Sequence, residues 1–147
     1  EFFYIIEYMS FTEQISKQLP EFNGSNWLLR IPLAIVFIQM GLSKFPLEIN
    51  DAESFNLPIT VWVFVAWGEL FSGFGLLIGG FLNLSKFLIS IGDLITRFSG
   101  IVIVGIMSGV ILTSEPESIL DVLLNDHFHL MLYFGGLFFA LRGSRVK

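Results

Sequence analysis

The 147-residue chain contains no cysteine, and only 14% of its residues are charged. Without cysteine the chain itself can form no disulfide, iron–sulfur cluster or thiolate metal site. Its few bases form no patch that would bind nucleic acid, and no phosphate loop, nucleophile elbow or metal motif occurs. Soluble domains average about 25% charged residues. The composition therefore excludes an ordinary soluble domain, and we expect neither a metal nor a covalently bound cofactor.

Apolar residues are abundant, at 54% of the chain with 16% aromatic, and the mean hydropathy is +0.75. These values predict an integral membrane protein surrounded by a lipid bilayer. Helices satisfy their backbone hydrogen bonds internally in lipid, so an all-α fold is expected. Four apolar runs predict a four-helix bundle within residues 27–147, and the last run is short for a full crossing. The four predicted spans of the bundle cover about residues 27–45, 59–82, 86–113 and 127–142.

Residues 1–26 precede the first predicted span and have a different pattern. Tyr4, Tyr8, Phe11 and Ile15 recur at intervals of three or four residues, with polar residues between them, up to Pro20. This pattern predicts an N-terminal amphipathic helix and a turn. The helix would lie on the membrane surface or on a partner subunit.

The charges outside the spans predict the orientation in the membrane. The connections 46–58 and 114–126 contain acids and no base. The bases Lys86, Arg142, Arg145 and Lys147 fall at the opposite ends of the spans. The positive-inside rule then predicts that both termini lie in the cytoplasm. We expect the membrane to be a bacterial inner membrane, and residues 118–125 to form a short surface helix.

Three charged residues fall inside predicted spans. Glu69 lies near the middle of 59–82, where an ionised carboxylate costs about 2.5–3.5 kcal/mol. Asp93 and Arg97 are four apart and share a helical face. Glu69 and Arg97 each lie roughly 16–20 Å from the inner end of their predicted helix. We therefore expect Glu69 to pair with Arg97, with Asp93 as a second acid. The group could relay protons, hold a quinone headgroup, or serve as a structural ion pair.

A second polar group is predicted near the outer surface, from Lys44, His127 and His129. The two histidines point about 200° apart on a helix, which excludes a bis-histidine haem within this chain. One histidine alone could bind a haem or a chlorophyll, and an interfacial hydrogen-bonded histidine is the simpler alternative. His129 shares a face with Tyr133 and Gly136, which makes it the better candidate for lining a pocket.

Helix packing is predicted by two further patterns. The first span places Ala34, Phe37 and Gly41 on one face with Arg30 and Lys44. That face should point inward, with the two bases near the span ends, where their side chains can reach the interfaces. In addition, two pairs of glycines, Gly75 with Gly79 and Gly105 with Gly109, match the GxxxG pattern, which is typical of closely packed membrane helices.

Two stretches resemble the DoxX-like family of small four-helix membrane proteins. The first is LLRIPLAIVFIQMGLSKF, which contains Arg30, Gly41 and Lys44, and the second is WGELFSGFGLLIGGF, which begins at Trp67 and contains Glu69. The resemblance covers about residues 27–142. It implies the four-helix membrane fold, with the third-helix arginine at Arg97. The connection before Arg97 is longer than the family pattern, so Lys86 is an alternative match.

The family resemblance also implies functions. The family includes DoxD-type thiosulfate:quinone oxidoreductase subunits, together with members in oxidative-stress complexes and in receptor assembly. The first hypothesis is a non-covalent quinone site in a membrane subunit of an oxidoreductase, which is not catalytic on its own. The residues expected at this site are Glu69, Arg97, Asp93, His129 and Lys44. The alternative is a non-catalytic accessory subunit of a respiratory or photosynthetic complex, and a small transporter is a third possibility.

Overall fold

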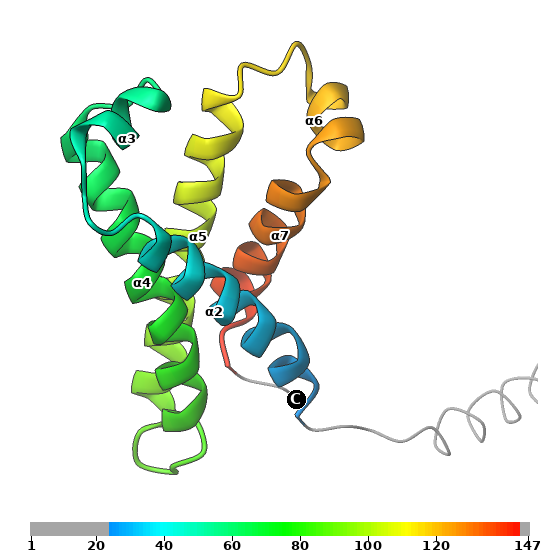
Figure 1. Cartoon of the computed structure of the whole chain (residues 1–147). Coiled ribbons are helices and arrows are strands. Elements are labelled where there is room, and N and C mark those ends of the chain that lie inside the picture. Colours follow the sequence, from blue (N-terminus) through cyan, green and yellow to red (C-terminus); the bar gives the residue numbers. More distant parts are fainter. Residues whose placement is uncertain (1–23, 145–147) are drawn as a thin grey trace, which may run out of the picture.

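The computed structural model describes residues 24–144, which are helical throughout apart from short connections and contain no strand (Figure 1). The amphipathic helix expected over residues 1–20 lies outside this described range. The helices are α2 (Ser25–Ser43), α3 (Ile49–Ser54), α4 (Ile59–Leu82), α5 (Ile89–Thr113), α6 (Ile119–Asn125) and α7 (His127–Arg142). The all-α prediction is confirmed for this range.

The number of spans differs from the four that were predicted. Helices α2, α4 and α5 are long and apolar enough to cross a bilayer. Helix α7 has 16 residues, fewer than the roughly 20 that a crossing needs. Two short helices, α3 and α6, occupy the acidic connections, and α3 was not predicted. Four spans are therefore not established, although α7 packs along α5 as part of the bundle.

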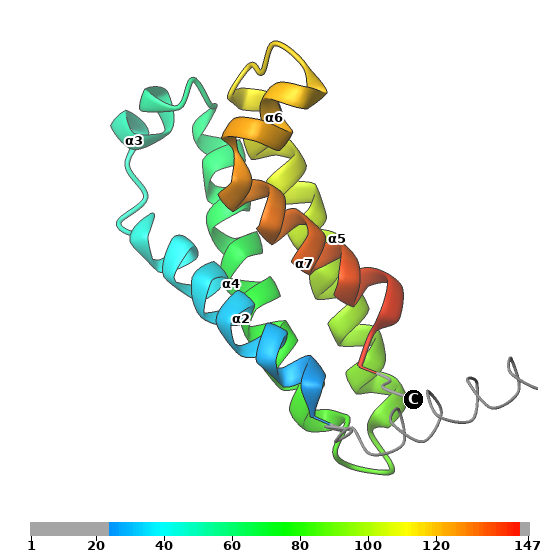
Figure 2. The ribbon, with the colours of Figure 1, turned by 90° about the vertical axis from the view of Figure 1, so that its right-hand side faces the viewer.

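The packing order places α4 and α5 at the centre. Helix α4 packs along α2 and α5, and α5 packs along α7 (Figure 2). Apolar side chains from all four helices meet in one core. Its buried members are Leu33, Ala34, Phe37, Leu76, Ile103, Met107, Leu132 and Phe139. The inward face predicted for α2 is confirmed, because Arg30, Ala34, Phe37 and Gly41 are all buried.

Small residues fix how closely the backbones approach. A Cβ added at Gly79 would lie 2.8 Å from the Gly92 carbonyl oxygen of α5, and one at Gly73 would lie 2.9 Å from the Ala34 carbonyl oxygen of α2. A Cβ at Gly100 would lie 2.6 Å from the Gly136 carbonyl oxygen of α7. Helices can approach this closely only where side chains are absent. The close packing predicted at Gly79 is therefore confirmed.

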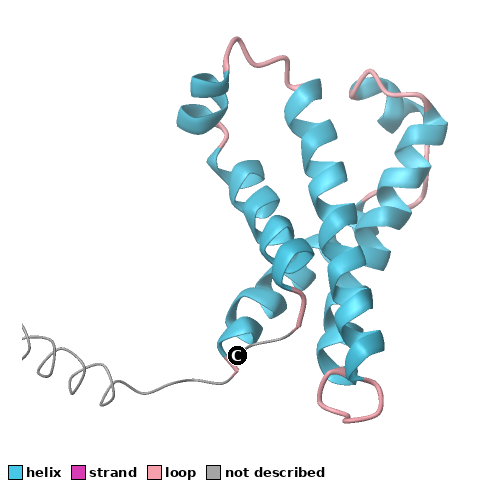
Figure 3. Ribbon diagram, turned by 180° about the vertical axis from the view of Figure 1, so that it is seen from behind, coloured by secondary structure: helices cyan, strands magenta, loops and turns pink. Residues whose placement is uncertain are grey.

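Helices α4 and α5 separate toward the end that carries α3. They lie together near the turn that joins them and diverge with distance from it (Figure 1). Figure 3 shows the same divergence from behind. This divergence makes room for the pocket described below.

Candidate functional site

The buried Glu69 carboxylate on α4 pairs with Lys44, the residue that follows α2. The Lys44 ammonium donates to both carboxylate oxygens, at 2.7 and 2.9 Å, and to the Met40 carbonyl oxygen at 3.3 Å. The Glu69 side chain is 1% exposed and that of Lys44 is 12% exposed. The pairing predicted between Glu69 and Arg97 is therefore wrong, because a lysine from another helix occupies that place.

The error came from the depth assigned to Arg97. Helix α5 begins at Ile89 rather than at Lys86, so Arg97 lies about 12 Å from its start, whereas Glu69 lies about 20 Å from the end of α4. Helix α2 runs the opposite way and brings Gly41 against Leu70 of α4. Lys44, one turn further, then reaches Glu69 part-way along α4.

Arg97 and Asp93 form a separate group at the end of α7. The Arg97 guanidinium bonds to Asp93 at 3.0 Å, as the spacing of four predicted. It also donates to the last carbonyl oxygens of α7, those of Ala140 (3.2 Å), Leu141 (2.5 Å) and Arg142 (3.1 Å). These carbonyls have no partner within the helix, and a cation also offsets the negative end of its dipole. Arg97 therefore caps α7 and does not line the site with Glu69.

Arg30 is a buried residue whose role the sequence patterns missed. It is 0% exposed, so its side chain lies on the predicted inward face but does not extend to an interface as expected. Its guanidinium donates to Thr96 Oγ1 at 3.0 Å, to Ser144 Oγ at 2.9 Å and to the Leu76 carbonyl oxygen. The ring of Phe139 lies 4.7 Å from it. Its position on the inward face of α2, one turn before Ala34, was the available signal.

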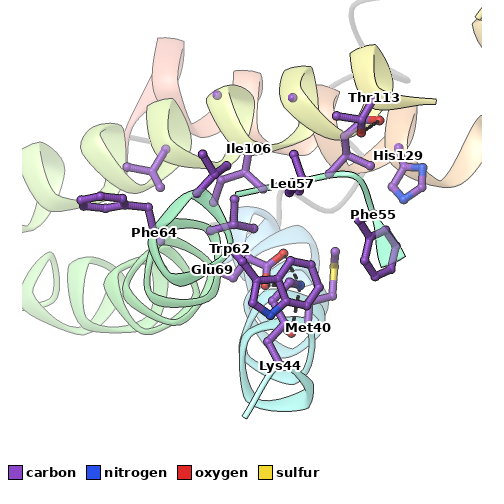
Figure 4. Close-up of a pocket in the computed structure, with 17 residues that line it drawn as sticks. Met40, Lys44, Phe55, Leu57, Trp62, Phe64, Glu69, Ile106, Thr113 and His129 are labelled. Atoms are coloured by element: carbon purple, nitrogen blue, oxygen red, sulfur yellow. Dashed lines mark hydrogen bonds and ion pairs between the residues drawn. The ribbon is translucent and has the colours of Figure 1, made fainter. Parts of the chain in front are cut away.

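The Lys44–Glu69 pair lies at the wall of a pocket of about 550 Å³ between the diverging helices (Figure 4). Four polar or charged side chains line it, namely Lys44, Glu69, Thr113 and His129. The remaining lining is apolar apart from three glycines. Those residues are Met40, Phe55, Leu57, Val61, Trp62, Phe64, Val65, Gly68, Val102, Gly105, Ile106, Gly109 and Val110. A few polar groups in a largely apolar pocket of this size are typical of a small-molecule site.

Trp62 of α4 covers the ion pair. Its indole ring lies 5.1 Å from Lys44 Nζ and stacks on Phe55 with 5.1 Å between ring centroids. Figure 4 shows the ring beside both charged groups. The indole Nε1 is buried and has no hydrogen-bond partner among residues 24–144. A buried donor without an acceptor is costly, so an acceptor placed here would be favoured.

His129 reaches the same pocket from α7. Its Nδ1 lies 2.6 Å from Asp126 Oδ1, and the side chain is partly exposed. His127 is exposed and is not among the lining residues. The predicted outer group is therefore formed only in part, since Lys44 and His129 share the pocket without His127. Within the described range, no three histidine or acidic side chains cluster as metal ligands would.

The family model described as DoxX matches residues 26–92, which include α2, α3, α4 and the start of α5. Lys44, Trp62 and Glu69 fall inside this match, whereas Arg97 and His129 fall outside it. No curated protein and no solved structure matches the chain.

Proposed function

Over residues 26–92 this chain is DoxX-like, with helices apolar enough to span a bilayer, and on that premise we propose that it binds a lipid-soluble quinone in the pocket between α4 and α5. It would do so as a non-catalytic subunit of a larger membrane complex whose other subunits supply the electrons. The observation that carries this proposal is the buried Lys44–Glu69 pair at the wall of an apolar pocket.

The chemistry of the pocket suits a quinone headgroup. A quinone has a planar ring with carbonyl acceptors and an apolar tail. The Lys44 ammonium donates to Glu69 and, over a longer 3.3 Å, to the Met40 carbonyl oxygen, which a quinone carbonyl would replace as acceptor. Trp62 Nε1 is an unused donor. The aromatic rings of Phe55 and Trp62 suit a flat, apolar partner. Glu69 is within reach to exchange a proton with Lys44 when a bound ring takes up or releases one.

The test is equilibrium binding of a tritiated short-chain quinone to the purified protein in lipid nanodiscs, with empty nanodiscs as the background. Glu69→Gln should weaken binding at least tenfold, because the ammonium loses its counter-charge and its fixed position. Trp62→Phe keeps the aromatic ring and removes one donor, so roughly two- to tenfold weaker binding is expected.

Glu48→Gln is the matched control, since Glu48 is exposed and outside the pocket, and it should bind as the unaltered protein does. Failure of the unaltered protein to bind quinone would overturn the proposal. In native membranes, a Glu69→Gln complex that keeps its electron transfer but dissociates on a native gel would favour the alternative function, an accessory subunit.

We also propose a bacterial inner-membrane location with both termini in the cytoplasm. The exposed acids Asp51 and Glu117 lie in the connections that contain α3 and α6, and these connections carry no base. Lys86 lies in the turn between α4 and α5, at the opposite end. This distribution supports the proposal through the positive-inside rule.

A further inference from the structure

We infer that the backbone of α5 at Gly105 and Gly109 is the wall against which the ring of the ligand lies, so that these two glycines set the size of ring the pocket accepts. This inference rests on the proposed quinone site and adds a determinant of its specificity.

The surroundings of the two glycines differ from those of the other described helical glycines. A Cβ added at Gly105 or Gly109 would meet no atom within 4 Å, whereas one at Gly79 or Gly100 would meet backbone under 3 Å away. The close helix packing predicted for the 105/109 pair is therefore wrong within the described part of the chain. Both glycines line the pocket instead.

The spacing of the pair makes the wall flat over one turn of helix. Residues four apart lie on one face, separated by about 6 Å along the axis. With no side chain at either position, the pocket keeps open space between the α5 backbone and α4. The side chains of Ile106 and Val102 lie beside this face and also line the pocket.

The opposite side of the pocket carries the aromatic and charged groups. Trp62 and Glu69 belong to α4, and Figure 4 shows them across the pocket from Ile106 and Thr113 of α5. A flat ring held between these sides would have Trp62 and the ion pair on one side and bare backbone on the other. The class of ligand that fits is a planar ring with a hydrogen-bond acceptor, carried on an apolar tail.

A side chain added at either glycine enters the pocket, because a Cβ placed there meets no neighbouring atom within 4 Å. The experiment measures binding of two tritiated probes in nanodiscs: a short-chain benzoquinone, and a naphthalene that carries the same tail and no carbonyl. Gly105→Leu and Gly109→Leu should each weaken both probes at least tenfold, and Gly105→Ala should weaken the larger naphthalene more than the benzoquinone.

The control is Ile101→Phe, a bulky change on an exposed position of α5 that does not line the pocket, and it should leave both affinities unchanged. Thermal unfolding of each variant verifies that the fold is kept. If the unaltered protein binds the quinone and the leucine variants bind it equally well, the inference is overturned and the proposed function stands. If only the naphthalene binds, and the leucine variants lose it, the wall is supported and the quinone function fails. Absence of binding by either probe overturns both.

Discussion

Lys44 and Glu69 are individually expensive in an apolar environment and stabilising only as a pair. Two nearly buried charges at 2.7 Å offset the free energy lost when each leaves water. Removing one partner leaves the other charge unpaired, which typically costs about 3–5 kcal/mol. Replacing both residues with apolar ones leaves no unpaired charge, so most of this cost is avoided.

We expect Lys44→Met to lower the free energy of unfolding by about 3–5 kcal/mol, and the double variant Lys44→Met/Glu69→Leu to recover most of that loss. Reversible unfolding by SDS in mixed micelles measures both. Lys86→Met, which removes an exposed base, should change the value little. Equal losses in the single and double variants would contradict the view that the unpaired carboxylate is the source of the instability.

Arg30 links three segments through one guanidinium. It holds Ser144, which follows α7, against Thr96 of α5 and the Leu76 carbonyl of α4. A lysine could not make these bonds together, because it lacks the planar fork of donors.

The substitution Arg30→Lys should therefore destabilise the protein by about 1.5–3 kcal/mol, the range for hydrogen bonds to a charged group. The check is SDS unfolding of the single variants Arg30→Lys and Ser144→Ala and of the double variant. Losses that add fully would show that Arg30 and Ser144 are not coupled, against the observed 2.9 Å contact.

At the scale of a single element, α7 depends on a residue from α5 for its last turn. Arg97 caps the C-terminus of α7 by donating hydrogen bonds to its last three carbonyl oxygens. Arg97→Gln should raise amide hydrogen exchange in the last turn of α7, for a local loss of about 1–2 kcal/mol. Arg142→Gln is the matched control, because Arg142 is exposed in the same turn. Unchanged amide hydrogen exchange in the last turn of α7 in Arg97→Gln would contradict the capping role of Arg97.

Helix α5 presents two kinds of glycine to its neighbours. Gly100 lies against the backbone of α7, whereas Gly105 has open space. Gly100→Ala should separate α5 from α7 and cost about 1–3 kcal/mol, the usual penalty for overpacking. Gly105→Ala should be neutral or slightly stabilising, because alanine is the better helix former. Thermal unfolding of the two variants compares them directly, and equal effects would contradict this division of α5.

For the whole molecule, the absence of cysteine makes the orientation measurable. Single-cysteine variants Asp51→Cys and Glu117→Cys should react in intact cells with a maleimide that cannot cross the inner membrane. Leu84→Cys, in the turn between α4 and α5, should react only after the membrane is opened. The opposite pattern would reverse the orientation, and labelling of all three in intact cells would contradict the bundle's proposed crossing.

The sequence by itself determined what depends on local composition. The apolar run predicted α4 over residues 59–82, and the i, i+4 spacing predicted the Asp93–Arg97 pair, because both are properties of one helix. The isolated acid at Glu69 was identified as a candidate site residue for the same reason.

Only the tertiary structure decided the contacts between helices. Glu69 received Lys44 instead of Arg97, Arg30 gained its partners Leu76, Thr96 and Ser144, and Gly105 faced a pocket instead of a neighbouring helix. These outcomes depend on where each helix begins and on the angle at which helices diverge. A start three residues later moves a side chain by about 4.5 Å along the axis and by most of a turn around it. Such differences arise from the packing of all the helices together, which no single stretch of sequence encodes.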